Sequence, residues 1–167
     1  MASVALLDQR CASPVAQCMR IEPITVLPRQ FNDLRADAHA EGFSHIEDLW
    51  RQWHEEGRCF DRRGEMLVVA LAGQDLAGIG GITEDFIDTS WLRMRRFYVR
   101  PTFRRQGVGK AIAEYVLSRA LPLNREIVLY AETPEAAAFW QAMGFVRVAR
   151  ERTTHAIPVR SSKRDTS

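Results

Sequence analysis

The chain has 167 residues, 46% of them apolar and 26% charged, which suits one globular domain with its own core. Its net charge of +2 is too small to indicate a nucleic-acid-binding protein, and no apolar stretch is long enough to span a bilayer. The three cysteines, Cys11, Cys18 and Cys59, show no CxxC spacing, which argues against a disulfide framework and against a zinc site. We therefore expect a cytoplasmic protein with no metal, no nucleic-acid partner and no membrane partner.

The two ends of the chain differ from its middle. The opening MASVALLDQRCASPVAQC has no basic n-region and is a poor signal peptide, whereas a strand-like pattern starts at Met19. The last residues, SSKRDTS, are polar throughout. We expect residues 1–18 to form a flexible extension, residues 19–160 a single domain and residues 161–167 a disordered tail.

The first half of the domain changes between strand and helix patterns. Pro28 fits the first turn of a helix, whose apolar residues recur at helical spacing until Gly42. Two apolar runs rich in Val, Leu and Ile flank the turn AGQDL, which is typical of a hairpin. The expected elements are a strand over 19–26, helices over 28–41 and 45–56, and strands over 65–72 and 77–83.

The second half has clear start and stop signals. Pro101 halts a strand over 91–100, and an apolar stripe predicts a helix over 107–120. Thr133 can cap the next helix, which Gly144 ends as a left-handed residue. Strands are expected over 126–131, 145–150 and 155–159. The order of these elements predicts an α/β fold with a mixed sheet and helices on its faces.

The densest signal is RRQGVGK, residues 104–110, between a strand and a helix. It fails the pattern GxxxxGK[ST], because Arg104 stands at the first glycine and Ala111 follows the lysine. It fails the dinucleotide pattern GxGxxG, because Ile112 replaces the third glycine. Glycines still let the backbone approach an anion, and the amides that open a helix have no internal partner. The loop is therefore either a phosphate cradle or a turn that only caps the helix.

Two motifs together resemble a known family. FYVRPTFRRQGVGKAI resembles the acetyl-CoA-binding motif of the GCN5-related N-acetyltransferases (the GNAT superfamily), in which a strand and V-x-P precede Q/R-x-x-G-x-G/A and a helix. Arg104, Gly107 and Gly109 fill that pattern. TPEAAAFWQAMGF resembles the second signature of the family through its paired alanines and its final GF. The order of elements matches the family over about residues 19–159.

The resemblance implies a fold and a cofactor. The fold would be a mostly antiparallel central sheet flanked by helices, with a splay between the fourth and fifth strands. The cofactor would be acetyl-CoA, with its pyrophosphate on the glycine loop and its pantetheine arm along the preceding strand. The residues expected to contact it are Phe97, Tyr98, Val99, Arg104, Arg105, Gln106, Gly107, Val108, Gly109, Lys110, Thr133 and Phe139.

Two catalytic groups that are common in the family are missing. A tyrosine of the second motif often protonates the leaving thiolate, but this chain has Trp140, which is a packing residue or a hydrogen-bond donor only. A frequent base is a glutamate on the strand before V-x-P, but LRMRR holds no carboxylate. Glu84, beside Asp85 at a strand end, and His155, whose ordinary pKa lies near neutrality, are the remaining candidates. The alternatives for them are a solvated turn and a structural histidine.

The acceptor of this family normally enters beside the first two helices. The residues expected to contact it here are Glu41, His45 and Arg58. Arg93, Arg95 and Arg96 on the following strand indicate an anionic substrate or the rim of the cofactor site.

Two functions follow from the resemblance. The first is an acetyl-CoA-dependent N-acetyltransferase that moves the acetyl group to a primary amine of a small molecule or peptide by direct attack on the thioester. The second is an acyl-CoA-binding sensor or regulatory module with little or no turnover. The first is favoured, because the cofactor loop is complete and the missing groups are replaceable. The family often forms homodimers, so a homodimer is a further expectation.

Overall fold

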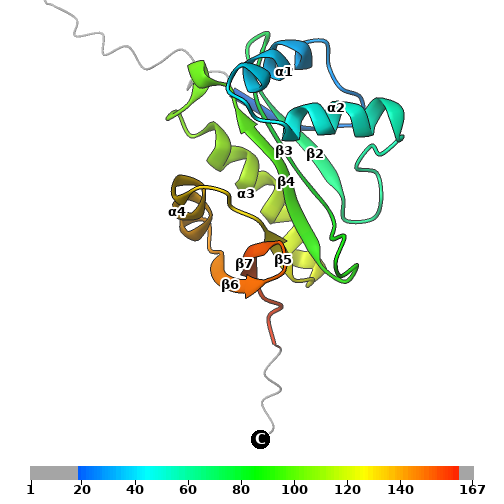
Figure 1. Ribbon diagram of the computed structural model, residues 1–167, viewed down its shortest axis with the longest axis vertical. Helices are drawn as coiled ribbons and strands as arrows, with labels where there is room; N and C mark the ends of the chain where they lie inside the picture. Colours follow the sequence, from blue (N-terminus) through cyan, green and yellow to red (C-terminus); the bar gives the residue numbers. More distant parts are fainter. Residues whose placement is uncertain (1–18, 162–167) are drawn as a thin grey trace, which may run out of the picture.

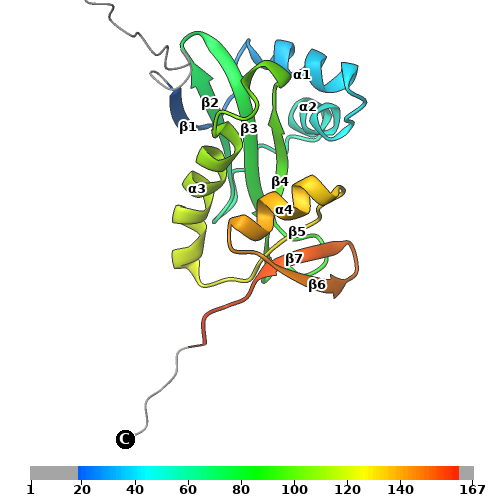
Figure 2. The same cartoon turned by 90° about the vertical axis from the view of Figure 1, so that its left-hand side faces the viewer.

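The computed structural model describes residues 19–161, which form a seven-stranded sheet with helices on both faces (Figure 1, Figure 2). The strand order is β1-β2-β3-β4-β5-β7-β6, and all neighbouring pairs are antiparallel except β4 and β5. The strands are β1 (Met19–Ile24), β2 (Met66–Ala72), β3 (Asp75–Glu84), β4 (Leu92–Val99), β5 (Ile127–Leu129), β6 (Val146–Arg150) and β7 (Thr153–Ile157). The mixed, mostly antiparallel sheet confirms the expected fold class.

The helices divide between the two faces of the sheet. They are α1 (Phe31–Ala40), α2 (His45–Glu55), α3 (Val108–Ala120) and α4 (Pro134–Ala142), and short 3-10 turns (Pro101–Phe103 and Leu121–Leu123) follow β4 and α3. Helices α1 and α2 lie together on one face, while α3 crosses the other (Figure 1). Among residues 19–161, no helix has the length and apolar character that crossing a bilayer requires.

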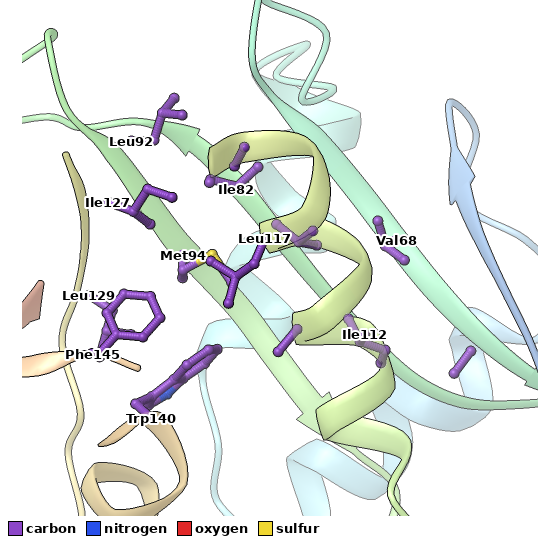
Figure 3. Packing of buried hydrophobic residues seen from close by; sticks show 14 of the residues in the cluster. Val68, Ile82, Leu92, Met94, Ile112, Leu117, Ile127, Leu129, Trp140 and Phe145 are labelled. Carbon is purple, nitrogen blue, oxygen red and sulfur yellow. The ribbon is translucent and has the colours of Figure 1, made fainter. Parts of the chain in front are cut away.

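Each face buries its own apolar cluster. On the α3 side, Ile112 and Leu117 of the helix pack against Val68, Ile82 and Met94 of the strands (Figure 3). The other cluster joins α1 and α2 to the opposite face of the same strands, through Phe31, Leu34, Ile46, Leu49, Leu67, Val69 and Ile79. Because side chains alternate between the faces of a strand, β2 and β3 contribute to both clusters, which explains their continuous burial.

The sheet opens between β4 and β5. These strands pair only at Leu92–Ile127 and Arg93–Val128, although β4 continues to Val99. The splay expected between the fourth and fifth strands is confirmed, and among the described residues no strand pairs with this edge of the second half of β4.

A bulge lies in β4 beside this open edge. Arg96 and Phe97 together face the single residue Gly80 of β3, and Arg96 has a φ of +64°. A Cβ at Gly80 would lie 2.7 Å from the Phe97 ring, so only glycine fits opposite the bulge. The bulge changes which backbone N–H and C=O groups of β4 point toward the open edge.

Some element boundaries differ from the expected ones. The first helix begins at Phe31 rather than at Pro28, because the Pro28 carbonyl accepts the Phe31 N–H in a turn. The strand expected over 126–131 ends at Leu129, where the chain leaves the sheet and the Ala131 N–H donates to the Thr154 hydroxyl. The expected extension and tail lie outside the described residues, apart from Ser161.

Candidate active site

A cavity of about 1240 Å³ lies in the gap between β4 and β5. It is lined from both faces of the sheet, by His45 of α2 on one side and by Gly109 of α3 and Trp140 of α4 on the other. Its charged side chains are unbalanced. The cationic ones are Arg93, Arg95, Arg96, Arg104, Arg105, Lys110 and Arg152, and the carboxylates are Glu132 and Glu135. The cavity therefore suits a ligand that carries negative charge.

Residues of the glycine loop line this cavity. The N–H groups of residues 105–110 donate to no acceptor among residues 19–161, and the first amide bonded back into the helix start is that of Ala111, to the Gly107 carbonyl. Arg105 and Gly107 have left-handed backbones, with φ of +60° and +77°. Residues of this kind turn neighbouring amides toward one point, as in anion-binding nests. The loop thus presents free amides at the positive end of α3.

Arg104 fixes the start of this loop. Its Nε donates to the Val99 carbonyl at 2.9 Å, and both terminal nitrogens donate to the Glu41 carboxylate at the end of α1. The Tyr98 hydroxyl donates to the same carboxylate. Hydrogen bonds from Arg104 and Tyr98 lower the pKa of Glu41, and the bond to Glu41 raises the pKa of Arg104. Glu41 is therefore a charged anchor for the loop.

The bulge decides which backbone groups of β4 face the gap. Before it, the Leu92 N–H points to the β5 side, where it donates to the Glu126 carbonyl. After it, the carbonyls of Phe97 and Val99 point to that side, where they bond His45 and Arg104. Because the N–H and C=O of a strand residue point the same way, the Val99 N–H also faces the gap. The open edge offers this donor next to the cavity.

His45 lies at the first turn of α2, against the open edge. Its Nε2 is 3.0 Å from the Phe97 carbonyl oxygen, and its ring packs edge-on against Phe43 and Tyr98. A carbonyl only accepts, so Nε2 carries the proton of this hydrogen bond. Burial lowers the pKa of His45, although the bond to Phe97 opposes this. The imidazole is therefore neutral at pH 7, and its Nδ1 is an unprotonated acceptor.

Helix α4 forms the opposite wall. The Thr133 hydroxyl accepts the Ala136 N–H at 3.1 Å, which confirms the predicted cap. Trp140 is 7% exposed, and its ring meets Phe97, Phe139 and Phe145 edge-on at centroid distances of 4.8, 4.8 and 5.3 Å. Figure 3 shows it beside Phe145 at the end of the apolar cluster. These contacts are those of a packing residue that also lines the cavity.

The structure brings most of the expected cofactor residues together. All of them line the cavity except Gln106, whose side chain donates to the Thr102 carbonyl. Of the expected catalytic residues, Trp140 lines the cavity, whereas Glu84 and His155 do not. Glu84 lies in a separate hollow of about 390 Å³ near Arg125. His155 is 1% exposed and bonds Gln141 and Thr154, as a structural histidine does.

The expected substrate residues separate in the same way. His45 lines the cavity. Glu41 lies behind it, bound to Arg104 and Tyr98. Arg58 lies outside the lining, and its guanidinium, on a side chain that is 67% exposed, is 3.4 Å from Glu56.

Several lining residues were not expected from the sequence. Tyr130 and Glu132 follow β5 and enter the wall because the chain leaves the sheet there. Phe86 and Arg152 come from the turns after β3 and β6, and Arg152 stacks on the Phe86 ring at 4.9 Å. None of these positions carries a local motif, so no sequence signal would have indicated them.

Comparison with known proteins gives consistent similarities. The model of the acetyltransferase (GNAT) domain matches residues 62–147. A protein of Exiguobacterium sp. 255-15 described as an acetyltransferase has a structure that is 30% identical in sequence, with a TM-score of 0.75, over 84% of this chain and 93% of its own. An acetyltransferase of Streptococcus agalactiae 2603 is similar in fold, with a TM-score of 0.66 and 17% identity over 86% of this chain and 99% of its own. The comparison with curated proteins gives no match.

Proposed function

Because this chain belongs to the GNAT superfamily of acetyltransferases, we propose that it is an N-acetyltransferase for a primary amine of a small molecule or peptide. Membership in the family makes it an acyltransferase that uses acetyl-CoA.

One observation carries the assignment of the cofactor site. Six successive amides, those of residues 105–110, lack an acceptor within residues 19–161, and they lie at the helix start beside Arg105 and Lys110. Unpartnered amides of this kind are satisfied by water or by an anionic ligand. A diphosphate bound here would accept from several of them without a metal, and acetyl-CoA carries a diphosphate.

The remaining wall residues suit the reactive end of the cofactor. Acetyl-CoA supplies an acetyl thioester, which needs an apolar channel and a donor for its carbonyl oxygen. Phe97, Phe139 and Trp140 provide the apolar wall, and the Val99 N–H faces the same gap. We assign the Val99 N–H as the donor that stabilises negative charge on that oxygen.

We assign His45 as the proton acceptor for the attacking amine. In the reaction, the amine nitrogen bonds to the acetyl carbon, the carbon–sulfur bond breaks, and one proton must leave the nitrogen. The neutral His45 ring has an unprotonated Nδ1, while its Nε2–H is held by the Phe97 carbonyl, which fixes the tautomer. Glu84 and His155 lie outside the cavity and are less suitable.

The leaving thiolate needs no dedicated acid in this site. The ordinary pKa of a thiol is ~8.5, so release as the thiolate at pH 7 costs only about 2 kcal/mol more than release as the thiol. Tyr98 is not free to act as an acid, because its hydroxyl donates to Glu41. Burial and the Glu41 carboxylate raise its pKa further.

Calorimetric titration of acetyl-CoA tests the cofactor site. We expect micromolar binding by the wild type, loss of binding in Gly107→Glu, and binding within a few fold of wild type in Gly107→Ala. Gly107 has a φ of +77° and an added Cβ would meet nothing within 4 Å, so both variants share the same backbone strain and only glutamate adds a charge. Gly73→Glu is a matched control, because Gly73 has a φ of +62°, equally open space, and no place in the cavity.

Turnover then separates the two functions. Thiol release with a panel of primary amines and peptides is expected for the transferase. Binding of acetyl-CoA without turnover on any amine would favour the sensor. Absence of binding by the folded wild type would refute both, and the loop would then be a helix-capping turn.

A further inference from the structure

The middle of β4 places two guanidinium groups in the cavity wall that form no salt bridge with a carboxylate of residues 19–161. We propose that the amine acceptor also carries an anionic group, a carboxylate or a phosphate, and that Arg95 and Arg96 bind it. This inference rests on the proposed N-acetyltransferase function, because it names the substrate class of the same site.

The guanidinium of Arg93, by contrast, is neutralised by partners within the protein. Its Nε donates to the Asp85 carboxylate, and its other nitrogens donate to the Arg152 carbonyl and the Thr153 hydroxyl, each at 2.8 Å. Both side chains of the pair are at most 5% exposed. Arg93 is therefore a structural residue, because Asp85 balances its charge and all three of its nitrogens bond partners within the protein.

Arg95 has no such partners. Among residues 19–161 its guanidinium makes no hydrogen bond and no salt bridge, although its side chain is partly buried in the cavity wall. Burial lowers the pKa of Arg95, and the nearby charges of Arg93 and Arg58 lower it further, against weaker opposing effects of Asp85 and Glu65. An unpaired cation in this position gains from any anion that enters the cavity.

Arg96 is only partly satisfied. One terminal nitrogen donates to Gln52 of α2 at 2.9 Å, whereas its buried Nε has no hydrogen-bond partner in the described part of the chain. Burial, followed by the charge of Arg95, lowers the pKa of Arg96 to about 10. Asp48 opposes this shift, but it bonds Arg51 instead of Arg96. Within the described part of the chain, two neighbouring guanidinium groups thus lack a counter-ion.

The bulge places these two arginines together. Successive residues of a regular strand point to opposite faces, but Arg96 has a φ of +64°. Arg95 lies on the face of Arg93, and Arg96 reaches Gln52 of α2 on that same face. Both guanidiniums therefore approach the cavity from the α2 side, which is also the side of His45.

The distance of Arg95 and Arg96 from His45 along β4 suits a small acceptor. Arg96 and Arg95 precede Phe97 by one and two residues, so at ~3.3 Å per residue they start about 3 to 7 Å along the strand from the carbonyl that holds His45. The loop cations Arg104 and Lys110 follow β4 at its other end, next to the free amides. The two cationic regions are thus separate, one for the cofactor and one for the acceptor.

Matched pairs of amines test the inference. Aminobutyrate is compared with butylamine, and aminoethyl phosphate with ethanolamine, by kcat/KM for thiol release. We expect the wild type to prefer the anionic member of at least one pair by about 10- to 100-fold, the effect of charge-assisted hydrogen bonds to an anion. Preference within the first pair identifies a carboxylate, and preference within the second identifies a phosphate.

Variants locate the preference. Arg95→Gln and Arg96→Gln should each lower the anionic-to-neutral ratio of kcat/KM about 10-fold. The ratio of the two kcat/KM values in one sample does not depend on the fraction of folded protein. A loss of stability would therefore not change this ratio. Arg20→Gln is the control, since Arg20 is a surface arginine of β1 at the edge of the sheet, paired with Glu22.

Calorimetric binding of the amines tests the anion site separately from acetyl transfer. Calorimetry of both pairs with the CoA-loaded protein should show tighter binding of the anionic amine in at least one pair, and this preference should be lost in Arg95→Gln. Equal affinity within both pairs, or a preference that survives both substitutions, would overturn the proposal even if neutral amines are acetylated. Anion-selective binding without acetylation would instead refute the transferase and retain the anion site.

Discussion

The ion pair of Asp85 and Arg93 gives the sharpest prediction for stability. The two side chains are 0% and 5% exposed, and they join the end of β3 to β4 and to the start of β7. Asp85 also accepts the backbone N–H groups of Ile87 and Asp88, each at 3.0 Å. We expect Asp85→Ala to leave the charge of Arg93 buried without a counter-ion, because the substitution supplies no other carboxylate.

The magnitude follows from this burial. Breaking a buried ion pair by removing one partner costs about 3–5 kcal/mol. The two turn amides lose their acceptor as well, but they lie in a partly exposed turn and can bond water. For a domain of this size, 1 kcal/mol corresponds to roughly 2–4 °C in Tm, so we expect Tm to fall by roughly 6–20 °C.

Urea unfolding followed by circular dichroism measures the effect. The Arg93→Met variant and the double variant complete a cycle with Asp85→Ala. Because the double variant has no buried charge without a counter-ion, it should be more stable than Asp85→Ala alone. A wild-type-like free energy of unfolding in Asp85→Ala, within about 1 kcal/mol, would refute this reasoning. So would a double variant less stable than the sum of the two single effects.

Two further predictions concern the site. In His45→Gln we expect kcat to fall by about 10²-fold or more. Since burial lowers the pKa of His45 below its ordinary 6.5, wild-type kcat should rise with pH through a pKa below that value and then level off. If kcat of His45→Gln still rises with pH over the same range, the titrating group is not His45. In Glu41→Gln we expect the Kd for acetyl-CoA, measured by calorimetry, to rise roughly 3- to 10-fold, because Arg104 loses a charge-assisted pair. Its Tm should change little, because that pair is partly exposed, and an unchanged Kd would mean that the Val99 carbonyl alone holds Arg104.

Much of the fold could be predicted from local patterns. Apolar residues at helical spacing predicted α2 and α3, and the cap at Thr133 with the left-handed Gly144 (φ +99°) bounded α4. These signals work because capping, turn geometry and one-sided burial depend on residues a few positions apart. The loop of residues 104–110 was found for the same reason, since all its groups are consecutive in the sequence.

The acceptor side could not be predicted in the same way. Glu41 was expected to meet the substrate, but its partners Tyr98 and Arg104 are more than fifty residues away in the chain. Glu84 was expected near the reaction, yet it lies at the far end of β3, where β4 and β5 still pair. Such roles depend on register and on where a strand pair ends, which local patterns do not contain.

The sequence by itself determined the elements, the glycine loop and the family, because each depends on short-range spacing. Only the tertiary structure decided that His45, rather than Glu84 or His155, lies in the cavity with Arg95 and Arg96. The physical reason is the combination of the β4–β5 splay and the bulge at Arg96, which opens one strand edge and turns adjacent arginines to one face. No local pattern in RMRR specifies that backbone, because it requires Gly80 on the neighbouring strand.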